Sequence, residues 1–194
     1  MYIPKQFLVE SSDAFSFIDQ NSFGQLISDV NGRLFSTHIP FLLSEDRSTL
    51  YAHIALQNAQ HTEIDGQEVL VVFQGEHAYI SPSWYSSSGV PTWNYQAAHV
   101  YGKAKVFSSK DKLKWLVDSL TQKYEAAFST PWQPDYNEKM LQAIVGIEIS
   151  ITEVQFKNKL SQNKSSEDQT NVISELRRSG DVKLADAMEK NKSI

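Results

Sequence analysis

Residues 69–102 read VLVVFQGEHAYISPSWYSSSGVPTWNYQAAHVYG, and this stretch decides how the rest of the chain is interpreted. It opens and closes with apolar residues typical of β-strands. Between them lie five large aromatic residues: Tyr79, Trp84, Tyr85, Trp93 and Tyr95. Small polar residues alternate with these rings: Ser81, Ser83, Thr92, Asn94 and His99. Flat apolar rings mixed with directional hydrogen-bonding groups suit a flat heteroaromatic ligand or an aromatic-rich subunit interface. A tryptophan-rich core hairpin would satisfy the same pattern.

The length and composition of the chain limit its class. At 194 residues it suits one domain, or one domain with a small appendage. It has no cysteine, which excludes disulfides, thiolate metal sites and cysteine nucleophiles. No apolar run approaches the length of a membrane span, and the first residues do not resemble a signal peptide. We therefore expect a cytoplasmic protein that does not bind membranes.

The net charge of −5 is unevenly distributed. Residues 157–194 carry eight Lys/Arg against six Asp/Glu, so the excess of negative charge lies in the first 156 residues. An acidic body with a mildly basic tail is a poor electrostatic platform for nucleic acid.

Short strands separated by turn signals predict a mainly β fold. Asn31-Gly32 indicates a two-residue hairpin, because both central positions of a type I′ turn require positive φ. Pro40 places its strand at an edge or a bulge. Strands are expected over residues 24–30, 33–43, 50–55, 69–73, 78–81, 92–107 and 147–151, with a bulge or turn near Glu153. This order favours a barrel or sandwich of mostly antiparallel strands.

Helices are predicted at fewer places. The longest is expected behind a Ser108-x-x-Asp111 capping signature, because apolar residues recur at helical spacing from Leu113 to Phe128. Residues 162–169 resemble a polar linker. Further helices are expected over residues 11–21 and 137–143, and in two short pieces separated by residues 179–181.

Several common catalytic motifs are missing from the sequence. It contains no G-x-G-x-x-G, no Walker lysine motif, no H-E-x-x-H and no G-x-S-x-G. Its five histidines are scattered singly, so no metal site is expected.

Six segments together resemble the PaiB family of FMN-binding split-barrel proteins. They are MYIPKQF (1–7), NSFG (21–24), THIPFLL (37–43), AYISPSWY (78–85), VPTWNYQAAHVYG (90–102) and KLSQNK (159–164). The resemblance implies a split β-barrel with peripheral helices, expected over residues 1–160, followed by a helical tail over residues 161–194. It also implies a homodimer with FMN in a cleft between the two subunits.

The resemblance also assigns residues to the FMN site. The turn after the third strand, LYAHIALQNAQ (50–60), places His53 and Asn58 at the phosphate. Thr37, His38 and Pro40 would lie beside the polar edge of the ring. The family usually has proline after the asparagine and a tryptophan soon after, whereas this chain has Ala59 and His61. Leu56 and Gln57 supply no cation there, which leaves the phosphate charge without a match in this turn.

Two further segments are expected at the same pocket. One group comes from the aromatic stretch and would reach the pocket from the partner subunit or pack in the dimer interface: Ser81, Trp84, Tyr85, Trp93 and Asn94. The other comes from the segment KLSQNK, which is either a binding segment or an exposed polar linker: Lys159, Ser161, Gln162 and Asn163. Lys159 would then balance the phosphate charge.

The family is associated with repression of sporulation and extracellular-protease genes, so the resemblance implies a non-enzymatic negative transcriptional regulator whose further partner is DNA or a regulatory protein. Residues 171–192 could form a helix-turn-helix, but Asp181, Asp186 and Glu189 interrupt its basic face, so direct DNA affinity should be weak. One alternative is a flavin-dependent oxidoreductase or haem-degrading enzyme, with His38 and His53 as proton donors or axial ligands. Another is a degenerate barrel that has lost its cofactor.

Overall fold

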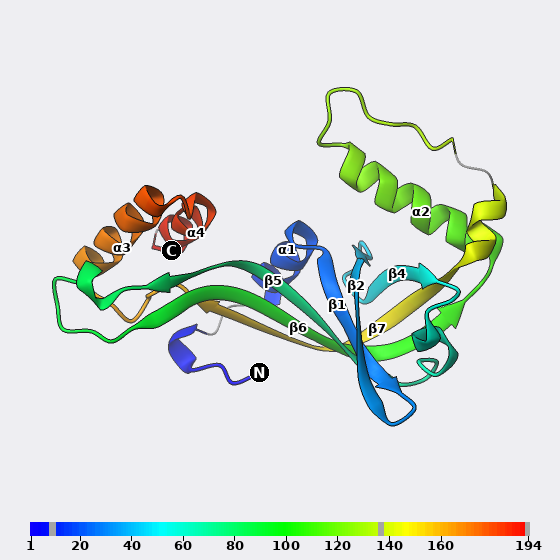
Figure 1. The fold of residues 1–194 in the computed structure, drawn as a ribbon, viewed down its shortest axis with the longest axis horizontal. Helices are drawn as coiled ribbons and strands as arrows, with labels where there is room; N and C mark the ends of the chain where they lie inside the picture. Colours follow the sequence, from blue (N-terminus) through cyan, green and yellow to red (C-terminus); the bar gives the residue numbers. More distant parts are fainter. Residues whose placement is uncertain (8–10, 136–137, 193–194) are drawn as a thin grey trace. The chain divides into compact units, whose positions relative to one another are not determined.

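The structure is a computed structural model that describes residues 1–7, 11–135 and 138–192. Its main element is a seven-stranded sheet with the strand order β2-β1-β5-β6-β7-β4-β3 (Figure 1). The strands are β1 (Phe23–Val30), β2 (Arg33–Pro40), β3 (Leu42–Leu43), β4 (Thr49–Ala55), β5 (Glu68–Ile80), β6 (Thr92–Phe107) and β7 (Ile144–Lys159). Every strand pairing with a known register is antiparallel. The mainly β class predicted from the sequence is confirmed.

The chain divides into two compact units. The barrel unit comprises Phe15–Phe73 and His99–Val154, and the tail unit comprises Met1–Ala14, Gln74–Ala98 and Gln155–Ile194. Strands β5, β6 and β7 each contribute residues to both units. The expected division at residue 160 remains a prediction, because the compact units group residues by contact and not by position in the chain.

The β1–β2 hairpin forms as the sequence predicts. Asn31 and Gly32 have φ values of 55° and 73°, as a type I′ turn requires, and Val30 pairs with Arg33 on either side of it. Along β1, buried residues alternate with more exposed ones, so Leu26 and Ser28 point into the core. β2 is an edge strand and ends at Pro40, which is where a residue without an N–H can be accommodated.

Helix α2 (Lys110–Glu125) buries Leu113, Leu116 and Leu120 in the barrel unit. Two details of the prediction for this helix are wrong. The residue at its N-cap is Ser109, whose side chain makes no capping hydrogen bond, so the capping box expected from Ser108 and Asp111 does not form. The helix also ends at Glu125, before Phe128, and Phe128 is exposed.

Two strands are longer than expected. β5 runs as a single strand through Gly75, whereas separate strands were expected over residues 69–73 and 78–81. β7 likewise continues through Glu153, so no turn forms there, while the alternative of a bulge remains a prediction. In both cases pairing within a wide sheet keeps the chain extended where the sequence favours an interruption.

The tail unit packs two helices on its own core. α3 (Ser166–Ser179) and α4 (Val182–Lys192) lie side by side (Figure 1) and are joined at Gly180, whose φ of 96° requires the freedom of glycine. Apolar residues of both helices bury Ile80, Tyr85 and Leu160. Only residues 160–165 remain between β7 and α3, so the expected linker is shorter than predicted.

The remaining elements are short. They are α1 (Ser11–Gln20) and the 3₁₀ turns η1 (Lys5–Phe7), η2 (Ala59–Thr62), η3 (Pro82–Trp84) and η4 (Glu138–Ala143). The expected helix over 137–143 is the 3₁₀ turn η4, and Asn137 lies outside the described residues. In the described part of the chain, no helix has the length and apolar character needed to cross a bilayer.

Candidate functional site

A hydrogen-bonded junction joins two of the predicted segments in the barrel unit. Asn58 Nδ2 donates to Thr37 Oγ1 at 3.0 Å, and the Thr37 hydroxyl donates to Gln60 Oε1 at 2.7 Å. Asn58 Oδ1 accepts the backbone N–H of Gln60 at 3.0 Å, which caps the turn η2. The structure therefore brings Thr37 and Asn58 into contact, whereas the resemblance assigns Thr37 to the ring edge of FMN and Asn58 to its phosphate.

Gln60 is the centre of this junction, and the sequence analysis did not identify it. It is fully buried, and its Nε2 donates to Ser28 Oγ at 2.8 Å and to the carbonyl of Leu26 at 3.3 Å. The carboxamide thereby fastens the turn after β4 to β1 and β2. A cap residue at Asn58 was the one sequence signal that could have indicated an ordered turn here.

His53 lies in the middle of β4, opposite Gly146 of β7. Its Nδ1 atom is buried and makes no hydrogen bond to any residue that the structure describes. Burial lowers the pKa of His53, so its imidazole is neutral at physiological pH. A buried ring nitrogen without a partner is energetically costly, so His53 Nδ1 is a candidate for a contact with a ligand or an ordered water.

His38 and Pro40 do not join the junction. Side chains alternate across a strand, so His38 points to the face of β2 opposite Thr37. There its exposed ring stacks on Phe23 with 6.4 Å between ring centroids. Phe23 is itself 62% exposed, so the two rings form an open aromatic surface that the sequence analysis did not predict.

The tail unit holds Lys159 through its amine. Lys159 Nζ donates to the Thr92 hydroxyl and, at 2.8 Å, to the carbonyl of Trp93. Burial, reinforced by the nearby charge of Lys157, lowers the pKa of Lys159. The Trp93 side chain remains 53% exposed and meets Tyr79 edge-to-face with 6.1 Å between ring centroids.

The rest of the segment 159–164 is also bonded within the tail unit. Ser161, at a φ of 65°, accepts a hydrogen bond from buried Asn94 at 2.9 Å. Gln162 accepts the backbone N–H of Leu160 and donates to the carbonyl of Asn158. Asn163 is exposed. The segment is therefore an ordered connection and not a loose linker.

Tyr85 packs in the core of the tail unit, with Lys164 Nζ 4.2 Å from its ring centroid. Its hydroxyl is buried and makes no hydrogen bond within the described residues. Burial raises the pKa of the Tyr85 hydroxyl. The nearby Ser161 side chain acts in the opposite direction and lowers this pKa, although the two side chains do not form a hydrogen bond of normal geometry. Ser81 caps the turn η3, which carries the half-buried Trp84.

The serine loop after Tyr85 is fixed by Asp168 of α3. Its Oδ1 accepts the backbone N–H groups of Ser86 at 2.7 Å and Ser87 at 3.3 Å, and its Oδ2 accepts the Ser87 hydroxyl at 2.6 Å. These hydrogen bonds, that of the Ser87 hydroxyl most strongly, lower the pKa of Asp168. Asp168 is buried, and the sequence analysis treated it only as part of a polar linker.

The predicted site residues thus fall into two groups, one in each unit. The group in the barrel unit consists of Thr37, His38, Pro40, His53 and Asn58. The group in the tail unit consists of Ser81, Trp84, Tyr85, Trp93, Asn94, Lys159, Ser161, Gln162 and Asn163.

The sequence matches one family of known domains. Residues 1–153 match the family described as "Putative FMN-binding domain". The chain belongs to this family, and FMN is its cofactor.

Individual relatives agree with this assignment. The chain is 41% identical over 185 residues to a protein of Bacillus subtilis strain 168 named "Protease synthase and sporulation protein PAI 2", an alignment that covers 91% of this chain and 89% of that protein. Two solved structures share the fold. The FAD and heme binding protein from Mycobacterium smegmatis has a TM-score of 0.66 at 14% identity, covering 86% of this chain and 79% of that one. The flavocytochrome Anf3 from Azotobacter vinelandii has a TM-score of 0.61 at 17% identity, covering 83% and 73%. At such identities the likeness shows the split-barrel fold alone.

The polar groups of the barrel unit fit a flavin nucleotide in part. A neutral imidazole with an unpaired ring nitrogen can contact a phosphate or ribityl oxygen, and His53 supplies one. The exposed rings of Phe23 and His38 offer a flat surface for an aromatic ring system. Asn58 fits less directly, because both polar atoms of its side chain already bond within the junction.

Proposed function

We propose that this chain is a homodimeric, FMN-binding regulator that acts in the cytoplasm on protease synthesis and sporulation, the processes named in its B. subtilis relative. The family match over residues 1–153 and the 89% coverage of that relative support the proposal. The observation that carries the flavin site is the junction at which Asn58 binds Thr37, with the unpaired Nδ1 of His53 in the strand that leads to it.

In this proposal the residues of the barrel unit have separate roles. His53 donates or accepts a hydrogen bond at FMN through Nδ1 and carries no charge, because burial lowers its pKa. Thr37, Asn58 and Gln60 hold the turn after β4 in place, so they act as positioning residues. When bound, FMN supplies a ring that can take up electrons reversibly, which gives a regulator a redox-dependent state.

Exposed aromatic side chains support the homodimer. In the tail unit, Tyr79 and Trp93 are 45% and 53% exposed and contact each other. Exposed large side chains that contact each other, as Tyr79 and Trp93 do, are typical of a protein–protein interface.

The charges of α3 and α4 favour regulation through a protein partner over direct DNA binding. Arg177 pairs with Asp186 at 2.7 Å and with Glu189 at 2.8 Å, and Arg178 pairs with Glu175. These carboxylates offset the cations that a recognition helix would present to phosphates. We therefore expect any direct DNA affinity of the tail to be weak.

Two measurements on the purified chain test the proposal. Its visible spectrum should contain flavin absorbance, and light scattering should report a dimer at micromolar concentration. Trp93→Asp should weaken the dimer, because it places a charge in the aromatic surface, whereas Val182→Asp provides an exposed control on α4. A haem Soret band, or a monomer with no flavin after FMN is added, would contradict the proposal.

A further inference from the structure

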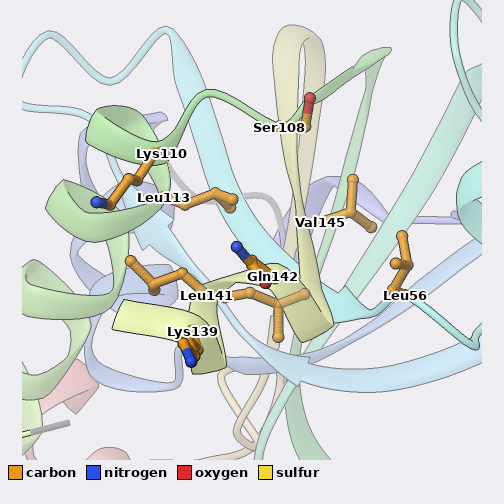
Figure 2. Close-up of a pocket in the computed structure, with 9 residues that line it drawn as sticks. Leu56, Ser108, Lys110, Leu113, Lys139, Leu141, Gln142 and Val145 are labelled. Carbon is orange, nitrogen blue, oxygen red and sulfur yellow. The ribbon is translucent and has the colours of Figure 1, made fainter. Parts of the chain in front are cut away.

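The barrel unit contains a cavity of about 340 Å³, which lies where α2 begins and where η4 meets the start of β7. Figure 2 shows the residues that line it. They are Leu56, Ser108, Lys110, Leu113, Lys139, Leu141, Gln142, Ile144 and Val145. The first turn of α2 also contains the carboxylate of Asp111, so the two lysines of the lining do not mark an anion site. The free edge of the sheet in this unit is more informative.

The two ends of the seven-stranded sheet differ in length and exposure. One end is β3, which has only two residues, both half-buried. The other end is β2, which has eight residues and has β1 as its only neighbour (Figure 1). Residues 33–36 of β2 are all exposed, so this half of the strand is open on both faces of the sheet. Short strands and charged residues usually protect such edges, but Arg33 carries the only formal charge in β2.

The hairpin turn determines which backbone groups of β2 face outward. A two-residue type I′ turn is closed by a hydrogen-bonded pair, here Val30 and Arg33. Hydrogen-bonded and non-hydrogen-bonded pairs then alternate along antiparallel strands, so the next pair, Asp29 and Leu34, exchanges no hydrogen bonds. Asp29 agrees with this alternation, because its backbone N–H and C=O both bond to the side chain of Gln67. Leu34 therefore directs its own N–H and C=O away from β1.

Every second residue from Leu34 onward shares this outward direction, which adds Ser36, His38 and Pro40. Pro40 fits an outward position, because it has no N–H to leave unpaired. Among the residues that the structure describes, none bonds to the outward backbone groups of Leu34, Ser36 or His38. Three successive free positions of this kind form a template for an added strand.

The side chains along this edge are also exposed and largely apolar. Leu34 is 77% exposed, and it lies on the same face of β2 as His38, whose ring stacks on the exposed ring of Phe23. Phe35 is 39% exposed and lies on the opposite face. A strand added at this edge would therefore bury apolar groups on both faces, in addition to pairing the backbone.

We propose that this edge pairs with the same edge of a second copy of the chain, in an antiparallel register centred on Ser36. The proposal rests on the proposed homodimer and names one of its contacts. In this register Ser36 lies opposite Ser36 of the partner subunit, and Leu34 lies opposite His38 of the partner subunit. All three outward positions of each strand then form hydrogen-bonded pairs.

The strand is complementary to itself in this register. Arg33 lies opposite Ile39 of the partner subunit, so no like charges face each other. A register centred on Leu34 would place the hairpin turn opposite Ser36, and one centred on His38 would place Pro40 there, so both would lose hydrogen bonds. A two-fold pairing also uses each free edge once, so the assembly closes at two copies.

The second copy contributes a side chain to the aromatic surface of Phe23 and His38. Directly opposite residues share a face, so Leu34 of the partner subunit would lie beside the His38 ring. This surface is the one that offers a flat contact for the ring of FMN. The pairing thus borders the proposed flavin site with an apolar residue from the partner.

A single introduced cysteine tests the register, because the chain contains no other cysteine. The Cα atoms of a hydrogen-bonded antiparallel pair are about 5.5 Å apart, within the roughly 4.4–6.8 Å that a disulfide spans. On mild oxidation at micromolar concentration, Ser36→Cys should give a disulfide-linked dimer on a non-reducing gel, and urea added before oxidation should abolish it. Ser88→Cys, at an exposed serine of the tail unit, is the control and should remain unlinked.

Sedimentation equilibrium of backbone and side-chain variants measures the strength of the contact. Ser36→Pro removes an outward N–H from each subunit without removing a bond to β1, and it should weaken the dimer about tenfold or more, whereas Ser36→Ala keeps the N–H and should not. Leu34→Lys protects the edge with a charge and should also weaken the dimer, whereas Val90→Lys, at a residue 72% exposed in the tail unit, should not. Circular dichroism checks the folding of each variant.

The outcomes separate this contact from the homodimer itself. A dimer that persists in Ser36→Pro and Leu34→Lys and forms no link at position 36 would overturn the edge pairing but leave the homodimer standing. A wild-type chain that is monomeric at micromolar concentration would overturn both.

Discussion

The turn at residues 56–60 of the barrel unit and the segment 159–164 of the tail unit are both short and rich in amides, yet they differ in what they leave unpaired. In the tail segment, Lys159, Ser161 and Gln162 all bond to neighbouring residues of the same unit. In the barrel turn, Asn58 and Gln60 are also paired, but the strand before it contains the unpaired Nδ1 of His53. Polar composition alone therefore does not identify a binding segment, whereas a buried polar atom without a partner, such as His53 Nδ1 or the Tyr85 hydroxyl, is a specific candidate for a ligand contact.

The largest expected effect is a loss of stability when the side-chain amide of Gln60, which organises the barrel turn, is removed. The Gln60 side chain is fully buried and binds the Thr37 hydroxyl, the Ser28 hydroxyl and the Leu26 carbonyl. Gln60→Ala leaves these three groups without this partner. We expect a loss of about 3 kcal/mol in the free energy of unfolding, because buried polar groups left unpaired are costly. Urea denaturation measures it.

The matched control is the exposed residue Gln57, three positions earlier. Gln57→Ala should change the stability by less than about 0.5 kcal/mol. Similar losses in the two variants would mean that Gln60 does not organise the turn.

The second expected effect is a pH dependence in the tail unit. Hydrogen bonds from the serine loop, foremost from Ser87, lower the pKa of Asp168 in the folded chain. A depressed folded pKa contributes stability above the unfolded value of about 3.9, and this contribution is lost as the pH falls through the lower folded value. Wild-type stability should therefore decline below about pH 4 more steeply than that of Asp168→Asn.

Thermal unfolding followed at several pH values measures this difference. A neutral side chain at position 168 has no proton to take up, so its curve should be flatter in that range. Parallel curves for the wild type and Asp168→Asn would show that the carboxylate does not hold the serine loop in its ionised form.

The smallest loss of stability is expected for Lys159→Ala. This variant distinguishes a structural role of the segment 159–164 from a role in binding FMN. Because its amine already binds Thr92 and Trp93, Lys159→Ala should cost about 1 kcal/mol of stability. Its FMN affinity should change less than about twofold, whereas a lysine that contacts phosphate would contribute roughly 1.5–3 kcal/mol to binding. Fluorescence titration with FMN distinguishes the two, and a large loss of affinity would restore the binding role predicted from the sequence.

Local signals in the sequence predicted much of the fold. Asn31-Gly32 and the alternation in β1 determine the hairpin, because turn chemistry and side-chain period act over a few residues. The predicted separation of the strands over 69–73 and 78–81 was wrong, because strand pairing in a wide sheet outweighs the weak local preference of residues 74–77.

The candidate site could be predicted only in part. Thr37 and Asn58, both assigned to the FMN site by the resemblance, contact each other, and their roles at FMN remain a prediction. Gln60 and Asp168 were missed, because a buried polar residue that binds distant backbone groups has no local pattern in the sequence. The cavity at α2 was missed for the same reason, since its lining comes from elements far apart in the chain.

The central claim, that FMN is held in the barrel unit through His53, is tested most directly by titrating His53→Ala with FMN and following the quenching of flavin fluorescence. The control is His77→Ala, an exposed histidine of the tail unit. The account predicts about a tenfold loss of FMN affinity for His53→Ala, as expected for a hydrogen bond to a charged group, and no change for His77→Ala. Equal affinity in the wild type and His53→Ala would contradict it.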